Sequence, residues 1–312
     1  MSRGLDREVN DLRERSSSWN DRRAVGDHDD SRSGRTWLLR TRIRSLDRER
    51  IPLDRELPEH DARDFVRVHD EVYRLRQSEV DALQQVGRFR IVDENDLERF
   101  EYADDSTRMR EDFRSLRAQG LIERHNIRTA DNERLRIVTL TDRGREAAAE
   151  FSDPDSRQRY YSGFVKPSEA EHDAALYRMY QAEAAEIRQK GGAVRRVELD
   201  FELKREVYGQ LGKAQGAAED ERRRVQHDVA ARHGLRVVRG RIQIPDVRIE
   251  YETAQGSTAR VSLELTTEHY RKGQIAAKAE AGFRLYSLGS NSSQGGSPVR
   301  DEREITVEIF SL

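Results

Sequence analysis

The chain has 312 residues, of which 57 are Lys or Arg, 59 are Asp or Glu and 35% are hydrophobic. This length predicts about two domains, because single hydrophobic cores stop growing at roughly 250–300 residues. No run approaches the roughly 18–20 apolar residues of a membrane span, and the acidic first residues lack the apolar stretch of a signal peptide. The absence of cysteine excludes disulfides, thiol nucleophiles, zinc fingers and iron–sulfur clusters. We therefore expect a cytoplasmic protein with no membrane partner.

Residues 1–70 are predicted to form a largely disordered or extended arm. This stretch alternates Arg with Asp and has too few apolar residues to offset the entropy that ordering it would cost. Only the segment Trp37-Leu38-Leu39 is apolar enough to dock on another surface. We expect the arm to lie outside the folded domains and to serve as a partner-binding element.

Residues 71–152 are predicted to form a first domain. Val80, Leu83 and Val86 recur at helical spacing before Gly87, and Asp93 is placed to cap a second, short helix. The elements expected after these are a third helix from residues 104–106 to Gly120, strands at 121–124 and 135–140 joined by a polar tip at 128–133, and a helix at 142–151.

The predicted third helix has two faces of different character. At about 100° per residue, Met109, Phe113 and Leu116 form an apolar stripe, and an arginine stripe lies on the other side. Exposed arginines suit the major groove and its phosphates, and the hairpin tip would add a contact beside the helix. The alternative is that these arginines pair with Glu111 and Asp112 or face water. The residues predicted to bind DNA are Ser106, Thr107, Arg110, Arg114, Arg117 and Arg128.

The segment 71–152 resembles winged helix-turn-helix transcription regulators of the multiple-antibiotic-resistance type. Three helices, a two-stranded hairpin and a helix follow one another in the winged-helix order. The phrases RSLRAQGLIERH and RIVTLTDRGREAAA are similar to motifs that recur in that family. The resemblance implies a DNA-binding domain at this place in the chain.

A linker is predicted at 153–165, and residues 166–312 are predicted to form a second, α/β domain. A helix to residue 190 precedes a strand at 194–201 and a charged helical stretch at 202–233. The elements expected after these are strands at 235–238, 242–251 and 260–265, a helix at 270–281, and strands at 283–287 and 305–311.

Two carboxylates of the second domain are the candidates for chemistry. Asp246 follows Ile244-Pro245 on one predicted strand, and Glu264 lies on the next. A hairpin can bring both carboxylates within reach of one Mg²⁺ or Mn²⁺ ion beside a phosphate. This arrangement resembles the PD-(D/E)XK nucleases, in which PD is followed by (D/E)-X-K on an αβββαβ core.

The sequence departs from the nuclease motif at Thr266, where the family has a lysine that positions water and stabilises the transition state. Thr266 is neutral and cannot offset charge that develops on a phosphate, which favours a catalytically degenerate domain. The opposing interpretation is purely structural: Asp246 caps a turn and Glu264 pairs with an arginine. The candidate substitutes for the lysine are Lys272 and Lys278, with His269 close by, and the resemblance makes Glu183 or Glu186 the candidate third metal ligand.

A winged helix joined to a nuclease-like domain resembles the replication-relaxation proteins of bacterial plasmids and integrative elements. The matching phrases are SLRAQGLIER, AEHDAALYRMY with His172, IPDVRIEY and VSLELTTEHYRKGQ. The expected fold class is therefore α+β, with an N-terminal winged helix-turn-helix followed by an α/β PD-(D/E)XK nuclease-like domain. The resemblance implies a DNA-binding accessory or regulatory protein of a mobile element, acting in replication, mobilisation or transcriptional control.

Two alternative functions stay open. One is a metal-dependent endonuclease that uses Asp246 and Glu264 with Lys272 or Lys278 as the missing cation. The other is an adaptor that docks on a relaxase or replication initiator. No cofactor is expected unless the endonuclease hypothesis holds, in which case Mg²⁺ or Mn²⁺ is required. The expected partners are double-stranded DNA, a relaxase or replication protein, and a second copy of the chain bound through the C-terminal domain.

Overall fold

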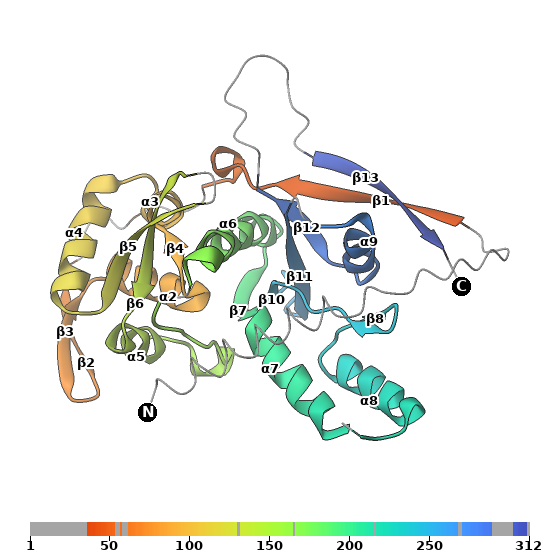
Figure 1. Ribbon diagram of the computed structural model, residues 1–312. Coiled ribbons are helices and arrows are strands. Elements are labelled where there is room, and N and C mark those ends of the chain that lie inside the picture. Colours follow the sequence, from red (N-terminus) through yellow and green to blue (C-terminus); the bar gives the residue numbers. More distant parts are fainter. Residues whose placement is uncertain are drawn as a thin grey trace, which may run out of the picture.

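The computed structural model describes residues 36–53, 57, 62–129, 132–164, 166–214, 216–267, 270–288 and 302–310. The fold is mixed α+β, as predicted, and its elements gather around a three-stranded and a six-stranded sheet with helix α6 between them (Figure 1). Within the described part of the chain, no helix is long and apolar enough to cross a membrane.

The three-stranded sheet has the order β4-β6-β5 and is covered by short helices. The elements of this half are β2 (Asp64–Val68), β3 (Glu71–Leu75), α2 (Gln77–Phe89), β4 (Val92–Asp93), α3 (Glu94–Tyr102), α4 (Ser106–Ala118), β5 (Ile122–Arg128), β6 (Arg134–Leu140) and α5 (Asp142–Glu150). Strands β2 and β3 form a separate hairpin.

A close contact after β6 explains the Leu-Thr-x-x-Gly phrase of the sequence. The Thr141 hydroxyl donates to the Gly120 carbonyl at 2.7 Å and accepts from the Gly144 amide at 3.0 Å, so it joins the end of α4 to the start of α5. A Cβ atom at Gly144 would lie 1.9 Å from the Leu121 carbonyl oxygen. Only glycine lets α5 pack this closely, and the contact holds α4 and the β5–β6 hairpin in one rigid unit.

The six-stranded sheet has the order β13-β1-β12-β11-β10-β7. The elements of this half are β1 (Thr36–Ser45), α6 (Pro167–Gln189), β7 (Ala193–Leu199), α7 (Asp200–Leu211), α8 (Glu219–Arg232), β8 (Val237–Val238), β9 (Arg241–Ile242), β10 (Val247–Glu252), β11 (Thr258–Thr266), α9 (Lys272–Glu280), β12 (Arg284–Ser287) and β13 (Glu302–Phe310). Short 3₁₀ turns lie at Arg48–Arg50, Pro154–Ser156 and Gly212–Ala214.

Strand β1 differs from the arm expected over residues 1–70. From Thr36 the chain lies in the large sheet, parallel to β12 and antiparallel to β13, and Thr41 and Ile43 are buried there. The strands that pair with β1 come from near the other end of the chain, so the sequence close to β1 does not predict the strand. Strand β2 also lies within the expected arm and pairs with β3. Residues 1–35, 54–56 and 58–61 of the arm lie outside the described residues.

The expected linker at 153–165 also packs on the fold. The Tyr160 ring is buried, and the Tyr161 amide donates to the Gly87 carbonyl at 2.8 Å. A Cβ atom at Gly87 would lie 2.8 Å from the Tyr160 ring, so glycine in α2 makes room for the tyrosine. The segment is therefore attached to the first half of the molecule.

Helix α6 connects the two halves through one continuous apolar core. Its Tyr177 and Tyr180 rings lie 5.4 and 5.1 Å from Phe89 of α2, while Val247 and Leu263 of the large sheet belong to the same buried cluster. The many buried aromatic contacts make this junction a packed core rather than a flexible joint.

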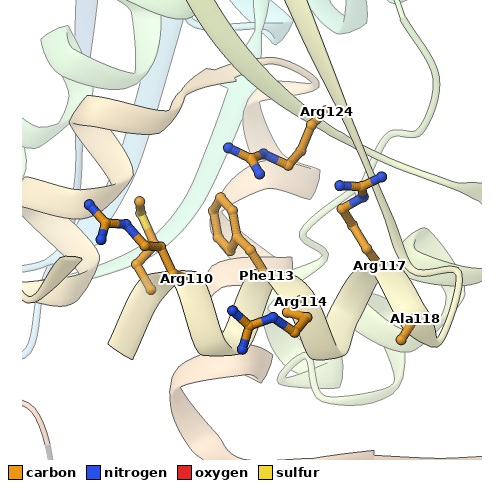
Figure 2. Close-up of a pocket in the computed structure, with 7 residues that line it drawn as sticks. Arg110, Phe113, Arg114, Arg117, Ala118 and Arg124 are labelled. Atoms are coloured by element: carbon orange, nitrogen blue, oxygen red, sulfur yellow. The ribbon is translucent and has the colours of Figure 1, made fainter. Parts of the chain in front are cut away.

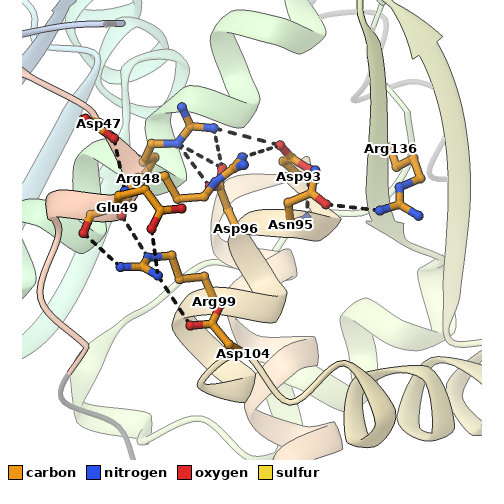
Figure 3. A network of polar contacts seen from close by, with 10 residues as sticks. Asp47, Arg48, Glu49, Asp93, Asn95, Asp96, Arg99, Asp104 and Arg136 are labelled. Carbon is orange, nitrogen blue, oxygen red and sulfur yellow. Dashed lines mark hydrogen bonds and ion pairs between the residues drawn. The ribbon is translucent and has the colours of Figure 1, made fainter. Parts of the chain in front are cut away.

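A polar network reinforces the junction. The Arg48 side chain binds Asp93 at 2.7 Å and also binds Asp96, while Arg99 donates to the Arg48 carbonyl at 2.8 Å (Figure 3). From the other side, Arg178 of α6 binds Asp96 at 3.0 Å. Asp96 is fully buried, and two arginines from distant parts of the chain neutralise it.

Candidate functional site

Helix α4 has the two faces that the sequence predicts. The Asp105 carboxylate caps its start by accepting from the amides of Thr107 and Arg108. Met109, Phe113 and Leu116 are buried, and the side chains on the opposite face are exposed. Three exposed arginines follow this outer face: Arg110, Arg114 and Arg117.

The acids of α4 are engaged with other parts of the fold. Asp112 is buried and accepts from Arg76 Nε at 2.5 Å and from the Ser78 hydroxyl at 2.7 Å. Glu111 also pairs with Arg76, at 3.3 Å. The acids therefore serve the inner side of the helix, so the alternative that they neutralise the outer arginines does not hold.

The outer arginines of α4 have no such partners. Within the described residues, the side chains of Arg110, Arg114 and Arg117 make no hydrogen bond or ion pair. Three neighbouring positive charges without counter-charges produce a local positive potential, although the net charge of the whole chain is only −2.

These arginines line a shallow hollow of about 470 Å³ that also involves β5. Figure 2 shows the side chain of Arg124, from β5, above the Phe113 ring and on the same side of α4 as the side chain of Arg117. The Arg124 guanidinium is held by Glu94 at 2.5 and 2.6 Å and lies 5.9 Å from the centre of the Phe113 ring. No carboxylate is among the residues that line the hollow, which are Met109, Arg110, Phe113, Arg114, Arg117, Ala118 and Arg124.

Arg124 is a candidate that the sequence analysis missed. It lies in the phrase LIERH, where it alternates with polar strand residues and carries no pattern of its own. It follows the end of α4 by six residues, but the chain turns back at Gly120, and only the folded hairpin places its side chain over the helix.

The other predicted DNA-binding residues lie near α4 but outside the hollow. Thr107 is exposed and Ser106 is half-buried, both in the first turn of α4. Arg128 is exposed at the end of β5, opposite Arg134, and donates to the Asn132 side chain at 2.7 Å. The structure thus groups the three helix arginines with Arg124, and leaves Arg128 at the tip of the hairpin.

A second group of charged side chains surrounds Asp246 and Glu264. Strands β10 and β11 are antiparallel neighbours, so the predicted hairpin is present. Glu264 is buried; one of its oxygens accepts from Lys278 Nζ at 2.7 Å and from the Tyr270 hydroxyl at 2.8 Å. Its other oxygen, Oε2, is buried and has no hydrogen-bond partner among the residues that the structure describes. Asp246 accepts from the Leu265 amide at 2.8 Å.

His172 of α6 completes this cluster. Its Nε2 lies 3.7 Å from Asp246, and its Nδ1 lies 3.5 Å from Asp173. Burial alone would lower the pKa of His172, but hydrogen bonds to Asp173 and Asp246 outweigh it and raise the pKa to about 10. The imidazole is therefore a cation at neutral pH.

The surroundings shift the pKa values of the two carboxyl groups in opposite directions. Burial, followed by repulsion from Asp246, raises the pKa of Glu264 to about 7. Burial would also raise the pKa of Asp246, but the hydrogen bond and charge of His172 and the charge of Lys278 lower it below its ordinary value. Lys278 and His172 therefore hold a negative Asp246 in a largely neutralised cluster.

The remaining predicted site residues lie apart from this cluster or serve packing. The Thr266 hydroxyl donates to the Tyr286 carbonyl at 2.8 Å, and Lys272 is exposed at the start of α9. Of the two candidate lysines, the structure brings Lys278 to Glu264. Glu183 of α6 binds Arg284 and accepts from the Tyr286 hydroxyl of β12, and among the described residues it joins no group of three metal-ligating side chains. His269 lies outside the described residues.

The cluster does not fit a divalent ion as it stands. Among the residues that the structure describes, no group of three or more His, Asp or Glu side chains is placed to hold a metal. Mg²⁺ and Mn²⁺ prefer oxygen ligands, but Oε1 of Glu264 already accepts from Lys278 and Tyr270. Oδ2 of Asp246 likewise accepts from the Leu265 amide. Among the buried side-chain atoms that the structure describes, Oε2 of Glu264 is the oxygen of this cluster without a hydrogen-bond partner.

Comparison with family models, with curated proteins and with solved structures finds no match for this chain.

Proposed function

We propose that this protein binds double-stranded DNA through α4 and acts as an accessory or regulatory protein of a bacterial plasmid or integrative element. In this proposal, residues 71–152 work as a winged helix-turn-helix, with α4 in the major groove and the β5–β6 hairpin as the wing. The observation that carries it is the row of exposed arginines on α4 that have no partner in the described part of the chain.

The dimensions and chemistry of α4 suit this role. An α-helix with its side chains is about 10–12 Å across and the major groove is about 12 Å wide, so the 13-residue helix α4 can lie in the groove. Arginine binds phosphate oxygens and the O6 and N7 atoms of guanine through two parallel hydrogen bonds. Arg110, Arg114 and Arg117 recur at helical spacing, so several can meet one groove at once.

The C-terminal half is proposed to be a nuclease-like platform without catalytic activity. Thr266 stands where the resemblance predicts a lysine and is bound to a strand carbonyl. Glu264 is held by Lys278 and Tyr270, and Asp246 by His172 and the Leu265 amide. Because protein groups already contact both carboxylates, the cluster is better suited to stabilising the fold than to exchanging a metal ion.

Fluorescence anisotropy of a labelled duplex, titrated with protein at several salt concentrations in EDTA, tests the DNA-binding proposal. We expect binding that weakens steeply with salt, because displaced counterions drive phosphate contacts. The variant Arg110→Ala plus Arg114→Ala should flatten the slope of log K against log salt by about 2, at roughly 0.9 per lost phosphate contact.

A matched control separates the α4 surface from general charge. Arg222 and Arg224 are exposed on α8, in the other half of the molecule (Figure 1). Arg222→Ala plus Arg224→Ala removes the same charge and should leave binding unchanged. Wild-type affinity in the folded α4 variant, or equal losses in both variants, would overturn the proposal.

The endonuclease alternative is tested separately with supercoiled plasmid and Mg²⁺ or Mn²⁺. One contact favours it, since Lys278 brings a cation to Glu264. We expect no nicking by the wild-type protein. Metal-dependent nicking that Asp246→Ala abolishes would establish the enzyme instead.

A further inference from the structure

The β2–β3 hairpin exposes an unusual face. Phe65 is 78% exposed and Val72 is 55% exposed, the highest values among the large apolar residues in the described part of the chain. Tyr73 and Leu75, on the other face, are buried against the first half of the molecule. The hairpin is therefore anchored through one face and open on the other.

Strand register places two arginines beside the open apolar residues. Phe65 lies opposite Arg74, and Arg67 lies opposite Val72, so side-chain alternation puts all four on one face. The Arg74 guanidinium lies 5.9 Å from the centre of the Phe65 ring. Within the described residues, neither Arg67 nor Arg74 pairs with a carboxylate.

The acids on the two strands of the hairpin lie on its anchored face, and Asp70 lies in the turn between the strands. Glu71 accepts from the Tyr73 hydroxyl at 2.6 Å and pairs with Arg143 of α5 at 2.9 Å. By strand alternation Asp64 shares the face of Tyr73 rather than that of Phe65. The open face thus combines positive charge with an aromatic ring, the same separation of charge that α4 shows with Glu111 and Asp112.

A side-chain clamp fixes this hairpin next to α4. Gln119, which closes α4, accepts from the Arg74 amide at 2.8 Å and donates to the Arg74 carbonyl at 3.0 Å. Its amide nitrogen also donates to the Ser115 hydroxyl at 3.1 Å. Figure 1 shows the hairpin beside the end of α4 at the same outer edge of the molecule. Arg67 and Arg74 therefore continue the positive surface beyond Arg117.

We infer that the open face of the β2–β3 hairpin is a second contact to the DNA backbone, adjoining the segment that α4 binds. Arg67 and Arg74 bind phosphates, and the Phe65 ring packs against the neighbouring sugars. This inference rests on the proposed function of α4. The argument for DNA as the occupant is charge complementarity. Two arginines that pair with no carboxylate in the described part of the chain adjoin the three on α4, while Asp64 and Glu71 lie on the other face and Asp70 lies in the turn.

The test compares Arg67→Ala plus Arg74→Ala with the wild type in the same anisotropy titration. Loss of two phosphate contacts should flatten the salt slope by about 1.8, so that the wild type loses about tenfold more affinity than the variant between 50 and 200 mM salt. Phe65→Ala should weaken binding with the wild-type slope, because it removes no charge. Arg222→Ala plus Arg224→Ala should match the wild type.

The possible results distinguish DNA binding by the hairpin from DNA binding by α4. If Arg110→Ala plus Arg114→Ala weakens binding while Arg67→Ala plus Arg74→Ala keeps the wild-type slope and affinity, the hairpin inference is wrong and the role of α4 stands. An unchanged hairpin variant that has instead lost a co-purifying protein would assign the face to a protein partner. If the wild type shows no salt-dependent binding, both are wrong. Circular dichroism spectra of each variant confirm that it is folded.

Discussion

The α4 surface and the Asp246–Glu264 cluster are the two charged regions that the sequence marked as candidate sites, and the fold treats them in opposite ways. On α4 the acids pair with Arg76, and Arg110, Arg114 and Arg117 stay exposed without a partner in the described part of the chain. Around Glu264 the cations turn inward, and Lys278 and His172 meet the carboxylates. Cationic side chains are therefore exposed to solvent on α4, whereas in the Asp246–Glu264 cluster they form ion pairs with carboxylates.

This difference separates charges that serve folding from charges that are available to a partner. A buried ion pair cannot lose one member without leaving an uncompensated charge, so its residues are tied to stability. An exposed arginine without a partner contributes little to stability and keeps all its donors for a ligand. Variants of the Asp246–Glu264 cluster should therefore change stability, whereas variants of the α4 arginines should change binding.

The largest loss of stability is expected at Asp96, a closed site outside both regions. Asp96→Asn removes the fully buried charge that Arg48 and Arg178 share and leaves both arginines to the one carboxylate of Asp93, which should lower the free energy of unfolding by about 3–5 kcal/mol. Urea unfolding measures the change. Asp104→Asn is the matched control, because Asp104 is 55% exposed and pairs with Arg99 at 3.4 Å, and it should cost no more than about 1 kcal/mol. Equal losses would contradict the distinction between closed and open pairs.

The next largest effect is a pH dependence at Glu264. Its pKa is about 7 in the folded chain against 4.5 ordinarily, so between these values the folded state holds a proton that the unfolded state has lost. Raising the pH through this window therefore destabilises the fold, by about 3 kcal/mol if the whole difference is expressed. Glu264→Gln cannot titrate and should lose this dependence. Urea unfolding at pH 4.5 and 7.5 measures both proteins, and parallel changes in the two would refute the assignment.

A smaller effect on stability is expected at the open surface. Arg110→Ala plus Arg114→Ala should change the free energy of unfolding by no more than about 0.5 kcal/mol, because neither side chain is buried or paired in the described structure. Thermal and urea unfolding of this variant accompany its DNA titration. A large loss of stability would show that these arginines belong to the fold after all.

The smallest effect is expected at Lys272, which the sequence offered as a substitute for the missing lysine. Lys272 is exposed, and Lys278 is the lysine that contacts Glu264. Lys272→Ala should leave both the free energy of unfolding and its pH dependence within about 0.5 kcal/mol of the wild type. A shift in the pH dependence comparable to that of Glu264→Gln would place Lys272 in the cluster.

Local pattern predicted the elements well where the chain follows one period. The apolar stripe of Met109, Phe113 and Leu116 specifies α4 and its buried face, and Gly120 marks its end. The adjacency of Asp246 and Glu264 follows from two consecutive strands joined by a short turn. Strand β1 was missed because its partners, β12 and β13, are more than two hundred residues away.

The amino-acid sequence by itself determined where most helices and strands after residue 71 form and which face of α4 is apolar, because these properties depend on neighbours within a few residues. Only the tertiary structure decided which charges are paired: Asp112 with Arg76, Arg124 with Glu94, and Glu264 with Lys278. Desolvation is the physical reason. A carboxylate that the core buries must meet a cation wherever packing brings one, and the charges that packing leaves outside remain available for a partner.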